Sequence, residues 1–439
     1  MLDKLKQILQ KHNVFLSGGA GVGKSFLTHE LKNSYKKSGK NVVALGSTAL
    51  SAFNIGGCTL HSFFCLGRIQ SVANLGIYDR KQREKLEKLN AFLKKLDLII
   101  IDEISMVSAA VFDMIALRLG SSRFRGKILI VGDFFQLPPV APKQSSLFSH
   151  SHYAFASFFW KELQLVNLKL SVPKRTSNAL FYRHLSLLRE GDWARIEVEY
   201  FKRFLISPAA FEDLDDDFTL LCGINKRANS INEQKLAKIP NPLFCIQAAE
   251  KINDEGLSKE QFDAWVRGLG ILLQLQLKVG ARVIFCINNF EQNYFNGEQG
   301  VVEEIADEEG CIKIRKNNHH TIILRPYTFL LEELGQDGGF ITRASLTQYP
   351  LKLAYAITIH KSQGMSIEKL VCDIDHIFEN GQLYVALSRA TEPKNLKIVY
   401  SKPLEFEDYF MQALKMDEGV REFYEKNIFV DLENEGAMR

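Results

Sequence analysis

The sequence predicts an α/β protein with two domains, each built around a parallel sheet. Short apolar runs such as NVFLSG, NVVALG, LDLIIIDE and KILIVGD each end in a glycine or a carboxylate and lead into helical periodicity. A second series repeats this pattern in FTLLCGIN, LKLAYAITIH, KLVCDID and NLKIVYS. Strands that alternate with helices are typical of a parallel sheet covered by helices. We therefore expect a first domain at about residues 1–165 and a second at about 166–439.

Two segments interrupt these series and predict small insertions. A charged, helical stretch runs from about Asp79 to Lys95, so we expect a helical insertion at about residues 65–95, although most such charge runs are only solvated helix faces. Later in the chain, GCIKIRKNN and HHTIILRP alternate polar and apolar residues, which favours short antiparallel strands. We expect an inserted small β-barrel at about residues 301–348.

Composition limits the class of protein. The 439 residues are 46% hydrophobic and 24% charged, as in ordinary globular proteins, and the longest apolar runs are too short to span a bilayer. The seven cysteines show no C-x-x-C spacing, so the sequence indicates neither zinc nor an iron–sulfur cluster, and a reducing cytosol suits them. The N-terminal MLDKLKQILQKH lacks a signal-peptide core, so we expect the mature chain to begin there, in the cytoplasm. The net charge of +4 requires any DNA-binding surface to be local.

The strongest motif is a phosphate-binding loop. GGAGVGKS follows the predicted strand NVFLS and precedes a predicted helix, which is the setting that a G-x-x-x-x-G-K-[ST] loop requires. Its glycines allow a tight turn with backbone N–H groups facing the phosphates, Lys24 adds a positive charge, and Ser25 offers a magnesium ligand. The expected ATP-binding residues are Gly18, Gly19, Ala20, Gly21, Val22, Gly23, Lys24 and Ser25.

A pair of carboxylates completes the predicted nucleotide site. Asp102 and Glu103 follow the apolar run LDLIII, so they should lie at the exposed end of a buried strand. We expect Asp102 to hold Mg²⁺ together with Ser25. Glu103 is then the candidate general base that polarises the attacking water beside the γ-phosphate.

Five further strings resemble the motifs of Pif1/RecD-like helicases. VGDFFQLPPV, from Val131 to Val140, resembles motif III of that family over its whole length. The other resemblances follow in the family's order: GSTALSAFNIGGCTLHSFF from Gly46, LKLSVPKRTSNALF from Leu168, LAYAITIHKSQGMS from Leu353 and YVALSRA from Tyr384. The resemblance covers nearly the entire chain. It implies two RecA-like P-loop domains and an ATP-dependent DNA helicase that moves 5′ to 3′ on single-stranded DNA.

The resemblance also implies roles for particular residues. Gln136 would sense the γ-phosphate, and Arg175 and Arg389 would reach it from the second domain. The segment from Thr358 to Gly364 would couple the nucleotide to DNA. An arginine that neutralises the transferring phosphoryl group only when the domains close would tie hydrolysis to domain movement.

Candidate DNA-binding residues lie in two stretches. In the first, aromatic rings alternate with hydroxyl groups, which suits stacking on bases and contact with phosphates, although single phenylalanines are more often part of the core. In the second, a polar cluster follows the apolar LKLAYAITI, where a strand would deliver it to an exposed end. The candidates are Thr48, Phe53, Thr59, His61, Ser62 and Phe63, with Thr358, His360, Lys361, Ser362 and Gln363.

The chain departs from the family pattern at three places. The A-P-T-G of motif Ia begins at Gly46 as GSTA, and the F-R-Q of motif IV reads KRT around Arg175, so the affinity for DNA is expected to differ. The glutamine that reads adenine in the family would fall about where Met1 stands. We therefore expect weak discrimination between ATP and GTP, unless Gln7 or Gln10 replaces the lost contact.

These features together predict an ATP- and Mg²⁺-dependent DNA helicase, acting as a monomer on DNA in a bacterial cytoplasm. Its expected substrates are single strands, 5′-tailed or forked duplexes, RNA–DNA hybrids and G-quadruplexes, and no residue distinguishes among them. One alternative is a DNA-binding ATPase that switches or loads without separating strands. Another is a P-loop kinase or metabolic ATPase, which would leave TLHSFF and TIHKSQG unexplained.

Overall fold

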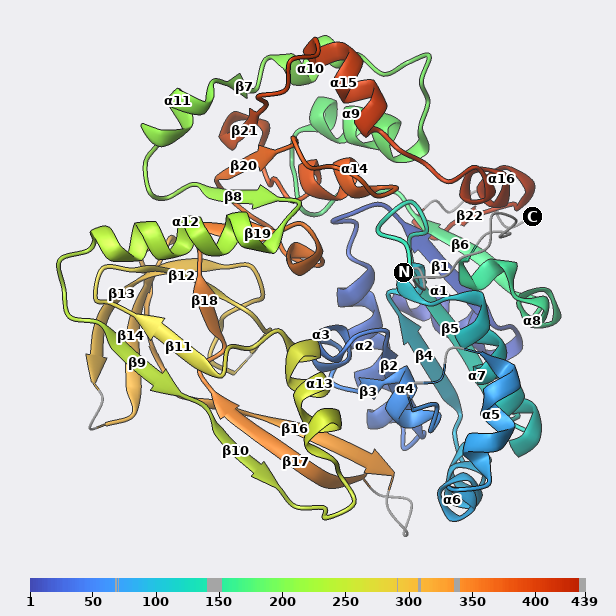
Figure 1. The fold of residues 1–439 in the computed structure, drawn as a ribbon. Coiled ribbons are helices and arrows are strands. Elements are labelled where there is room, and N and C mark those ends of the chain that lie inside the picture. The colour runs from blue at the N-terminus through green and yellow to red at the C-terminus, as the bar shows by residue number, and fades with distance from the viewer. Residues whose placement is uncertain are drawn as a thin grey trace. The chain divides into compact units, whose positions relative to one another are not determined.

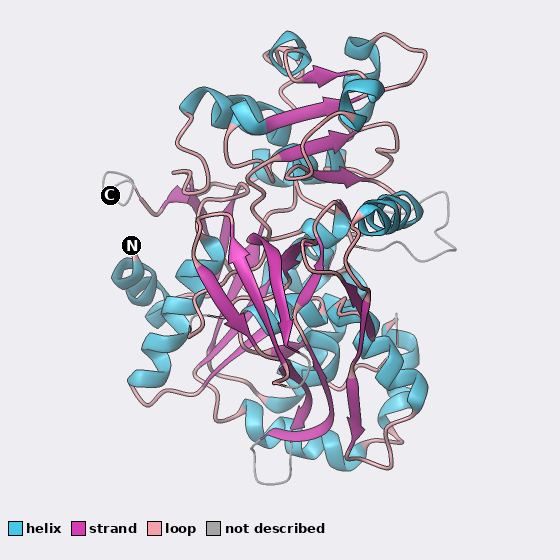
Figure 2. Ribbon diagram, turned by 90° about the vertical axis from the view of Figure 1, so that its left-hand side faces the viewer, coloured by secondary structure: helices cyan, strands magenta, loops and turns pink. Residues whose placement is uncertain are grey.

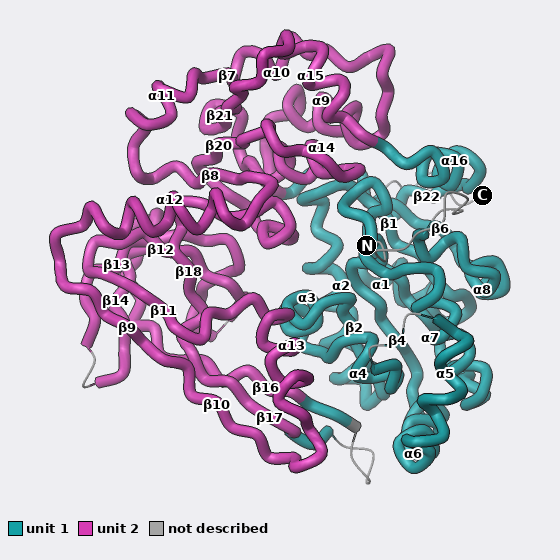
Figure 3. The backbone as a smooth tube through the Cα atoms, in the orientation of Figure 1, with its two compact units in different colours: residues 1–174, 332–342, 416–439 teal, residues 175–331, 343–415 magenta. Residues whose placement is uncertain are grey.

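The computed structural model describes residues 1–67, 69, 71–139, 152–289, 291–306, 309–334 and 340–433. Two compact units make up the chain, and Figure 3 colours them separately. Unit 1 contains residues 1–174, 332–342 and 416–439, and unit 2 contains residues 175–331 and 343–415. Both are α/β units, as the sequence predicts, and Figure 2 separates their helices from their strands by colour.

Unit 1 is built on a seven-stranded parallel sheet with the order β22-β6-β1-β5-β4-β2-β3 (Figure 1). The apolar runs of the sequence form its central strands, and every residue of β1 and β4 is buried, as expected for a sheet covered on both faces. The strands are β1 (Val14–Gly18), β2 (Val42–Gly46), β3 (Cys58–Thr59), β4 (Leu98–Asp102), β5 (Lys127–Gly132), β6 (Val166–Leu170) and β22 (Val430–Asp431).

The helices of unit 1 include the predicted insertion. Within residues 65–95, the structure forms α5 and α6, and Leu75 and Leu89 pack into the same core as the sheet. The helices are α1 (Leu2–Lys11), α2 (Lys24–Lys37), α3 (Ala49–Asn54), α4 (Leu60–Phe63), α5 (Val72–Asp79), α6 (Arg83–Leu93), α7 (Ala109–Ser122), α8 (Phe158–Glu162) and α16 (Glu418–Lys426), with short 3-10 turns at η1 (Ile104–Met106) and η2 (Ala154–Ala156).

Unit 2 contains a second parallel sheet with the order β19-β8-β20-β21-β7. Its strands are β7 (Leu205–Ile206), β8 (Thr219–Cys222), β19 (Ala356–Thr358), β20 (Leu370–Asp373) and β21 (Leu396–Val399). Its helical segments are α9 (Ala179–Glu190), α10 (Val198–Lys202), α11 (Pro208–Glu212), α12 (Asn225–Lys238), α13 (Lys259–Leu269), η3 (His360–Ser362), α14 (Gln382–Leu387), η4 (Pro393–Asn395) and α15 (Phe406–Ala413).

Small β-sheets lie in the chain between α12 and β19. One has the order β15-β14-β13-β12-β18, a second β10-β17-β16, and a third pairs β11 with β9. These strands extend beyond the predicted segment 301–348 on both sides, because β12 pairs with both β13 and β18. They are β9 (Phe244–Gln247), β10 (Ala249–Ile252), β11 (Gln274–Leu277), β12 (Arg282–Phe285), β13 (Gln299–Ala306), β14 (Cys311–Lys316), β15 (Thr321–Leu324), β16 (Tyr327–Leu334), β17 (Phe340–Gln348) and β18 (Leu351–Leu353).

The division into units differs from the predicted boundary near residue 165 in two respects. First, β6 adds to the sheet of unit 1 next to β1, so unit 1 continues to Lys174. Second, the C-terminal segment 416–433 returns to unit 1, where β22 pairs in parallel with β6 and α16 buries Val420 and Phe423 in the core. Strand pairing between distant segments thus sets the division.

Candidate ATPase and DNA-binding site

Three predicted site segments of unit 1 lie at one edge of its sheet. The phosphate loop follows β1, Asp102 ends β4, and Gln136 lies just beyond β5. Strand β5 lies between β1 and β4, with Ser17 aligned to Gly132 and Ile101 aligned to Ile130. Because parallel strands point the same way, their carboxyl ends bring these segments together, which is where α/β sheets bind ligands.

The predicted phosphate loop joins β1 to α2. Gly21 and Gly23 have φ values of 75° and 92°, a left-handed conformation that glycine adopts without steric cost. A Cβ on Gly18 would stand 2.7 Å from the carbonyl oxygen of Leu170, so only glycine fits there. The ammonium of Lys24 donates to the carbonyls of Gly18 and Gly19, at 2.6 and 2.9 Å. The lysine charge therefore lies against the loop backbone.

Asp102 and Glu103 form a close acidic pair. Asp102 is only 4% exposed, and its Oδ1 accepts a hydrogen bond of 2.9 Å from the backbone N–H of Glu103. Burial raises the pKa of Asp102, and the neighbouring Glu103 charge raises it further. Glu103 has a left-handed backbone with φ 53° and ψ 49°. For a residue with a side chain, such a conformation costs about 1–3 kcal/mol and tends to occur at functional sites.

Gln136 is held by a buried carboxylate in the motif after β5. Asp133 is fully buried and Gln136 is 5% exposed. Gln136 Nε2 donates to Asp133 Oδ2 at 3.4 Å, and the backbone N–H of Phe135 donates to Asp133 Oδ1 at 3.3 Å. The structure thus places Gln136 beside the other nucleotide-site candidates of unit 1. Val140, the last residue of the motif, lies outside the described residues.

Arg175 and Arg389 both lie in unit 2. They are the two arginines predicted to reach the γ-phosphate from the second domain, as arginine fingers do. Arg175 donates to Ser366 Oγ at 2.7 Å and to the Ser388 carbonyl at 2.8 Å. Burial lowers the pKa of Arg175 to about 9, with a further contribution from the like charge of Arg389. Arg389 is 1% exposed, and its Nε donates to the Val385 carbonyl at 2.9 Å. Both guanidinium groups stay charged at neutral pH, and two such neighbouring charges favour an anion close to them.

The predicted coupling segment begins at the end of β19. Thr358 is buried there, and the next residues form η3. His360 Nε2 lies 2.7 Å from the Glu379 carboxylate. The carbonyl of Ser362 accepts a bond of 3.4 Å from Arg389 Nη1, which connects this segment with the finger candidate. Lys361 is exposed and Gln363 is partly exposed, so both offer polar groups at the surface.

Two threonines among the DNA-binding candidates of unit 1 cap short helices. Thr48 Oγ1 accepts from the backbone N–H of Ser51 at 3.1 Å at the start of α3, and Thr59 Oγ1 accepts from Ser62 at 3.2 Å at the start of α4. A hydroxyl that accepts a capping bond keeps its own proton, and Thr48 donates this proton to Ser51 Oγ at 3.1 Å. Phe53, on α3, stays partly exposed. These three residues are compatible with a surface role.

Phe63 differs from the other candidates because it belongs to the core. It is 3% exposed and packs edge-on against Phe64 and Phe92, with ring centroids 4.9 and 6.1 Å apart. This geometry leaves no ring face for a base and favours the core role over stacking. His61 is partly exposed, and burial lowers its pKa, so at neutral pH its ring offers stacking and a neutral hydrogen bond.

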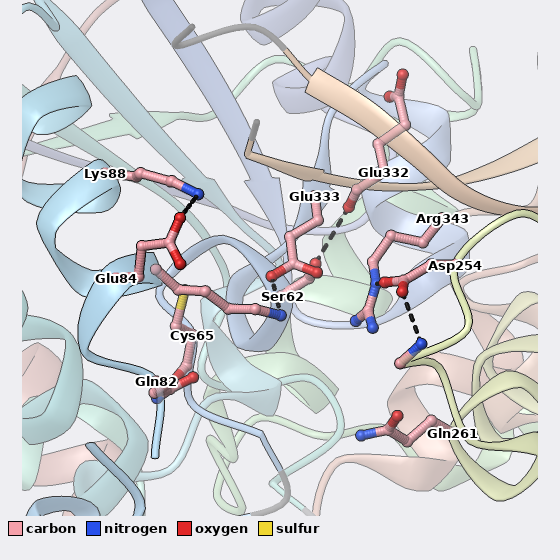
Figure 4. Close-up of polar contacts among 12 residues, drawn as sticks. Ser62, Cys65, Gln82, Glu84, Lys88, Asp254, Gln261, Glu332, Glu333 and Arg343 are labelled. Carbon is pink, nitrogen blue, oxygen red and sulfur yellow. Dashed lines mark hydrogen bonds and ion pairs between the residues drawn. The ribbon is translucent and has the colours of Figure 1, made fainter. Parts of the chain in front are cut away.

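Ser62 lies beside the end of β16, where Glu332 and Glu333 group with unit 1. Figure 4 shows its hydroxyl directed at Glu332, whose carbonyl accepts at 3.3 Å. The neighbouring Glu333 carboxylate pairs with Lys85 of α6 at 2.6 Å. On β17, Arg343 pairs with Asp254 at 2.6 Å within unit 2. Ser62 can contact a DNA phosphate only after its hydroxyl leaves the Glu332 carbonyl.

The two candidate adenine readers, Gln7 and Gln10, lie on α1. Both are exposed, whereas Leu5 and Leu9 form the buried face of the helix. An exposed amide is not held at a fixed place by packing. The weak discrimination between ATP and GTP therefore remains our prediction for this site.

Some residues beside the nucleotide site have no recognisable signal in the sequence. The hydroxyl of Tyr424, on α16, lies 2.7 Å from Ser17 Oγ, directly before the phosphate loop. The backbone N–H of Lys174 donates to the Gly21 carbonyl at 2.7 Å. Tyr424 lies about four hundred residues after the phosphate loop, on an amphipathic helix that carries no known motif. The sequence therefore gives no sign that it contacts Ser17. Asp133 lies inside the string VGDFFQLPPV, where the resemblance singles out Gln136.

Comparison with known proteins is consistent with this geometry. The family described as PIF1-like helicase matches residues 4–182, and a second family, described as Helicase, matches residues 305–418. The chain is 59% identical to the ATP-dependent DNA helicase Pif1 of Campylobacter jejuni, with 99% of both chains covered. It is 32% identical to the ATP-dependent DNA helicase Pif1 of Bdellovibrio bacteriovorus, covering 94% of this chain and 88% of that one.

Solved structures resemble the chain over nearly its full length. Bacteroides sp Pif1 in complex with ADP-AlF4 has a TM-score of 0.80 at 28% identity, covering 97% of this chain and 96% of that chain. Bacteroides Pif1 bound to ssDNA has a TM-score of 0.65 at 28% identity, covering 97% and 96%. These similarities support two RecA-like domains and exclude a P-loop kinase. The chain belongs to the PIF1-like family of ATP-dependent DNA helicases.

Proposed function

We propose that this helicase hydrolyses ATP at the loop between β1 and α2 and moves 5′ to 3′ along single-stranded DNA, separating the strands of a duplex. One observation carries the proposal: the segment Gly18–Ser25, the pair Asp102–Glu103, and Gln136 lie at the ends of three adjacent strands of one sheet. Phosphate-binding N–H groups, carboxylates and a side-chain amide in one place are what phosphoryl transfer to water requires.

Ser25 and Asp102 are the residues that would hold Mg²⁺. Hydroxyl and carboxylate oxygens suit this hard cation. Asp102 also fits the role because burial and the adjacent Glu103 charge both disfavour its ionised form, and a cation offsets both effects. When bound, the cation supplies charge that stabilises the phosphates.

The remaining nucleotide-site residues divide the work of hydrolysis. Lys24 contributes a positive charge beside the β- and γ-phosphates, and Glu103 accepts a proton from the attacking water. Gln136 uses its side-chain amide to orient the γ-phosphate or that water. Arg175 and Arg389 supply the additional positive charge that the transition state needs. These arginines belong to unit 2, and the other groups belong to unit 1.

The proposed DNA contacts use both units. In unit 1, the hydroxyls of Thr48, Thr59 and Ser62 contact phosphates, while Phe53 and His61 stack on bases. In unit 2, the segment Thr358–Gln363 contacts the strand and transmits the state of the nucleotide site, since Ser362 already bonds to Arg389. The Lys361 and Gln363 side chains are exposed enough to meet a strand.

The substrates follow from these contacts and from the relatives. The single-stranded DNA in the Bacteroides relative supports a single strand as the track, and forked duplex DNA in another solved Pif1 structure supports forked and 5′-tailed substrates. We extend the proposal to G-quadruplexes and RNA–DNA hybrids, with a monomer as the active form, in a bacterial cytoplasm near the nucleoid. In the part of the chain that the structure describes, no helix is long and apolar enough to cross a membrane.

Release of a labelled strand from tailed duplexes tests the polarity. With ATP and Mg²⁺, a duplex with a 5′ tail should be unwound efficiently, whereas the same duplex with a 3′ tail should remain intact. The Lys24→Ala variant, purified in parallel, controls for contaminating helicases. Unwinding of the 3′-tailed duplex alone would contradict the proposal.

A further inference from the structure

Tyr424 brings the C-terminal helix to the base of the phosphate loop. Its ring stacks on Phe135, with centroids 4.4 Å apart and an interplanar angle of 17°. Its neighbour Phe423 is buried in the core of unit 1, which fixes the helix in place. The Tyr424 hydroxyl lies 2.7 Å from the hydroxyl of Ser17, and Ser17 is 1% exposed. A residue close to the C-terminus therefore contacts the strand end from which the phosphate loop begins.

The same hydroxyl connects to the motif that contains Gln136. It accepts from the backbone N–H of Phe134 at 3.3 Å and donates to Asp133 Oδ1 at 3.5 Å. A tyrosine hydroxyl has one proton. When that proton is directed at Asp133, Ser17 donates to Tyr424, and each of the two hydroxyls then has an acceptor for its proton. The bonds then run from Ser17 through Tyr424 to Asp133.

Asp133 completes the connection to Gln136. Since a carboxylate oxygen only accepts, the amide nitrogen of Gln136 must face Asp133, as in the 3.4 Å contact between Gln136 Nε2 and Asp133 Oδ2. This contact fixes which end of the amide points away from Asp133. All four side chains from Ser17 to Gln136 belong to unit 1. Buried networks of this kind rigidify the groups they connect when every member is satisfied.

A second set of contacts fixes the C-terminal segment next to the same loop. Asp431 Oδ2 accepts from Ser171 Oγ at 2.6 Å, and Glu433 Oε2 accepts from the backbone N–H of Val172 at 2.7 Å. Two residues further along, Lys174 donates its backbone N–H to the Gly21 carbonyl. The C-terminal segment therefore contacts Ser17, just before the phosphate loop, and the segment 171–172, which lies close in sequence to the loop's partner Lys174.

We propose that Tyr424 is a positioning residue for ATP hydrolysis, acting through Asp133 to hold Gln136 in its orientation relative to the phosphate loop. The inference rests on the proposed role of Gln136 at the γ-phosphate. Tyr424 itself touches neither nucleotide nor water in this account. Loss of the Tyr424 hydroxyl should therefore lower kcat and leave KM unchanged, because binding of the nucleotide depends mainly on the loop and Lys24.

The Tyr424→Phe variant removes the hydroxyl and keeps the ring that stacks on Phe135. We expect its kcat for ATP to fall by about tenfold or more. A misplacement of a reacting group by about 1 Å can lower the rate by about 10²-fold, so a loss of this size is reasonable. The KM for ATP and the thermal midpoint should stay close to those of the parent. The matched control is Tyr409→Phe, which removes a tyrosine hydroxyl that donates to Ile374 in unit 2, and it should keep the parent kcat.

A double-mutant cycle shows whether Tyr424 acts through Gln136. If it does, Tyr424→Phe combined with Gln136→Ala should have about the kcat of Gln136→Ala alone, because the hydroxyl has nothing left to position. Multiplicative losses would assign Tyr424 a general structural role and overturn the inference. A parent-like kcat for Tyr424→Phe would also overturn it.

Failure of the underlying assignment has a different signature. If Gln136→Ala keeps the parent kcat, the proposed function of Gln136 is wrong, and the inference falls with it whatever Tyr424→Phe does. If Gln136→Ala is impaired and Tyr424→Phe is not, only the inference fails. The four kcat values and their KM partners therefore separate the two failures.

Discussion

Glu103→Gln is expected to stop ATP turnover while nucleotide binding persists. Glutamine keeps the shape of the side chain but cannot accept a proton from water, and loss of a general base typically costs about 10²- to 10⁴-fold in rate. The binding charges come from other groups, Lys24 and the backbone of the loop. Steady-state kcat and the Kd of a fluorescent ATP analogue measure the two effects separately.

Lys24→Ala is the complementary variant and should lose binding and turnover together, because it removes charge at the phosphates. Lys37→Ala, in the last turn of the same helix, is its matched control, and Lys37 is exposed. A normal kcat in Glu103→Gln would remove this residue from the role of base.

Arg389→Ala and Arg175→Ala should each lower the kcat for ATP by about 10³-fold or more, as loss of an arginine finger does. Alanine removes the positive charge of the guanidinium. Water cannot replace that charge at a buried position. Binding of single-stranded DNA should persist, since neither residue is among the proposed DNA contacts. ATPase assays and fluorescence anisotropy with a labelled oligonucleotide measure the two properties.

Arg389 needs additional controls because its guanidinium also donates to the carbonyls of Val385 and Ser362. Arg389→Lys keeps the charge but loses the planar fork, so it tests whether geometry or charge matters. Arg195→Ala removes an exposed arginine of the same unit and should keep the parent kcat. A kcat within severalfold of the parent in Arg175→Ala or Arg389→Ala would exclude that residue as a finger.

The sequence was informative where local patterns determine structure. The strand before Gly18 and the strand before Asp102 are continuous apolar runs, and both form fully buried strands of a parallel sheet. The loop between β1 and α2 has a fixed glycine spacing, so its position could be predicted directly. The prediction of two α/β domains is confirmed by the structure and by the relatives.

The remaining features depend on contacts between distant segments. Strand β22 is only two residues long, Val430 and Asp431, and nothing in its sequence indicates that it pairs with β6. Phe53 and Phe63 both lie on short helices after β2, yet only Phe63 is buried, because the packing of Phe64 and Phe92 decides it. Tyr424 is an ordinary residue of an amphipathic helix until the fold brings it to Ser17.

The rate of ATP hydrolysis with and without single-stranded DNA shows whether this chain couples its nucleotide site to DNA. We propose that turnover at the Gly18–Ser25 loop is coupled to movement along a DNA strand. We expect a saturating oligonucleotide to raise the parent kcat severalfold and the stimulated rate to disappear in Glu103→Gln. A 5′-tailed duplex should lose its labelled strand under the same conditions. An ATPase rate that is unchanged by single-stranded DNA, together with an intact 5′-tailed duplex, would contradict it.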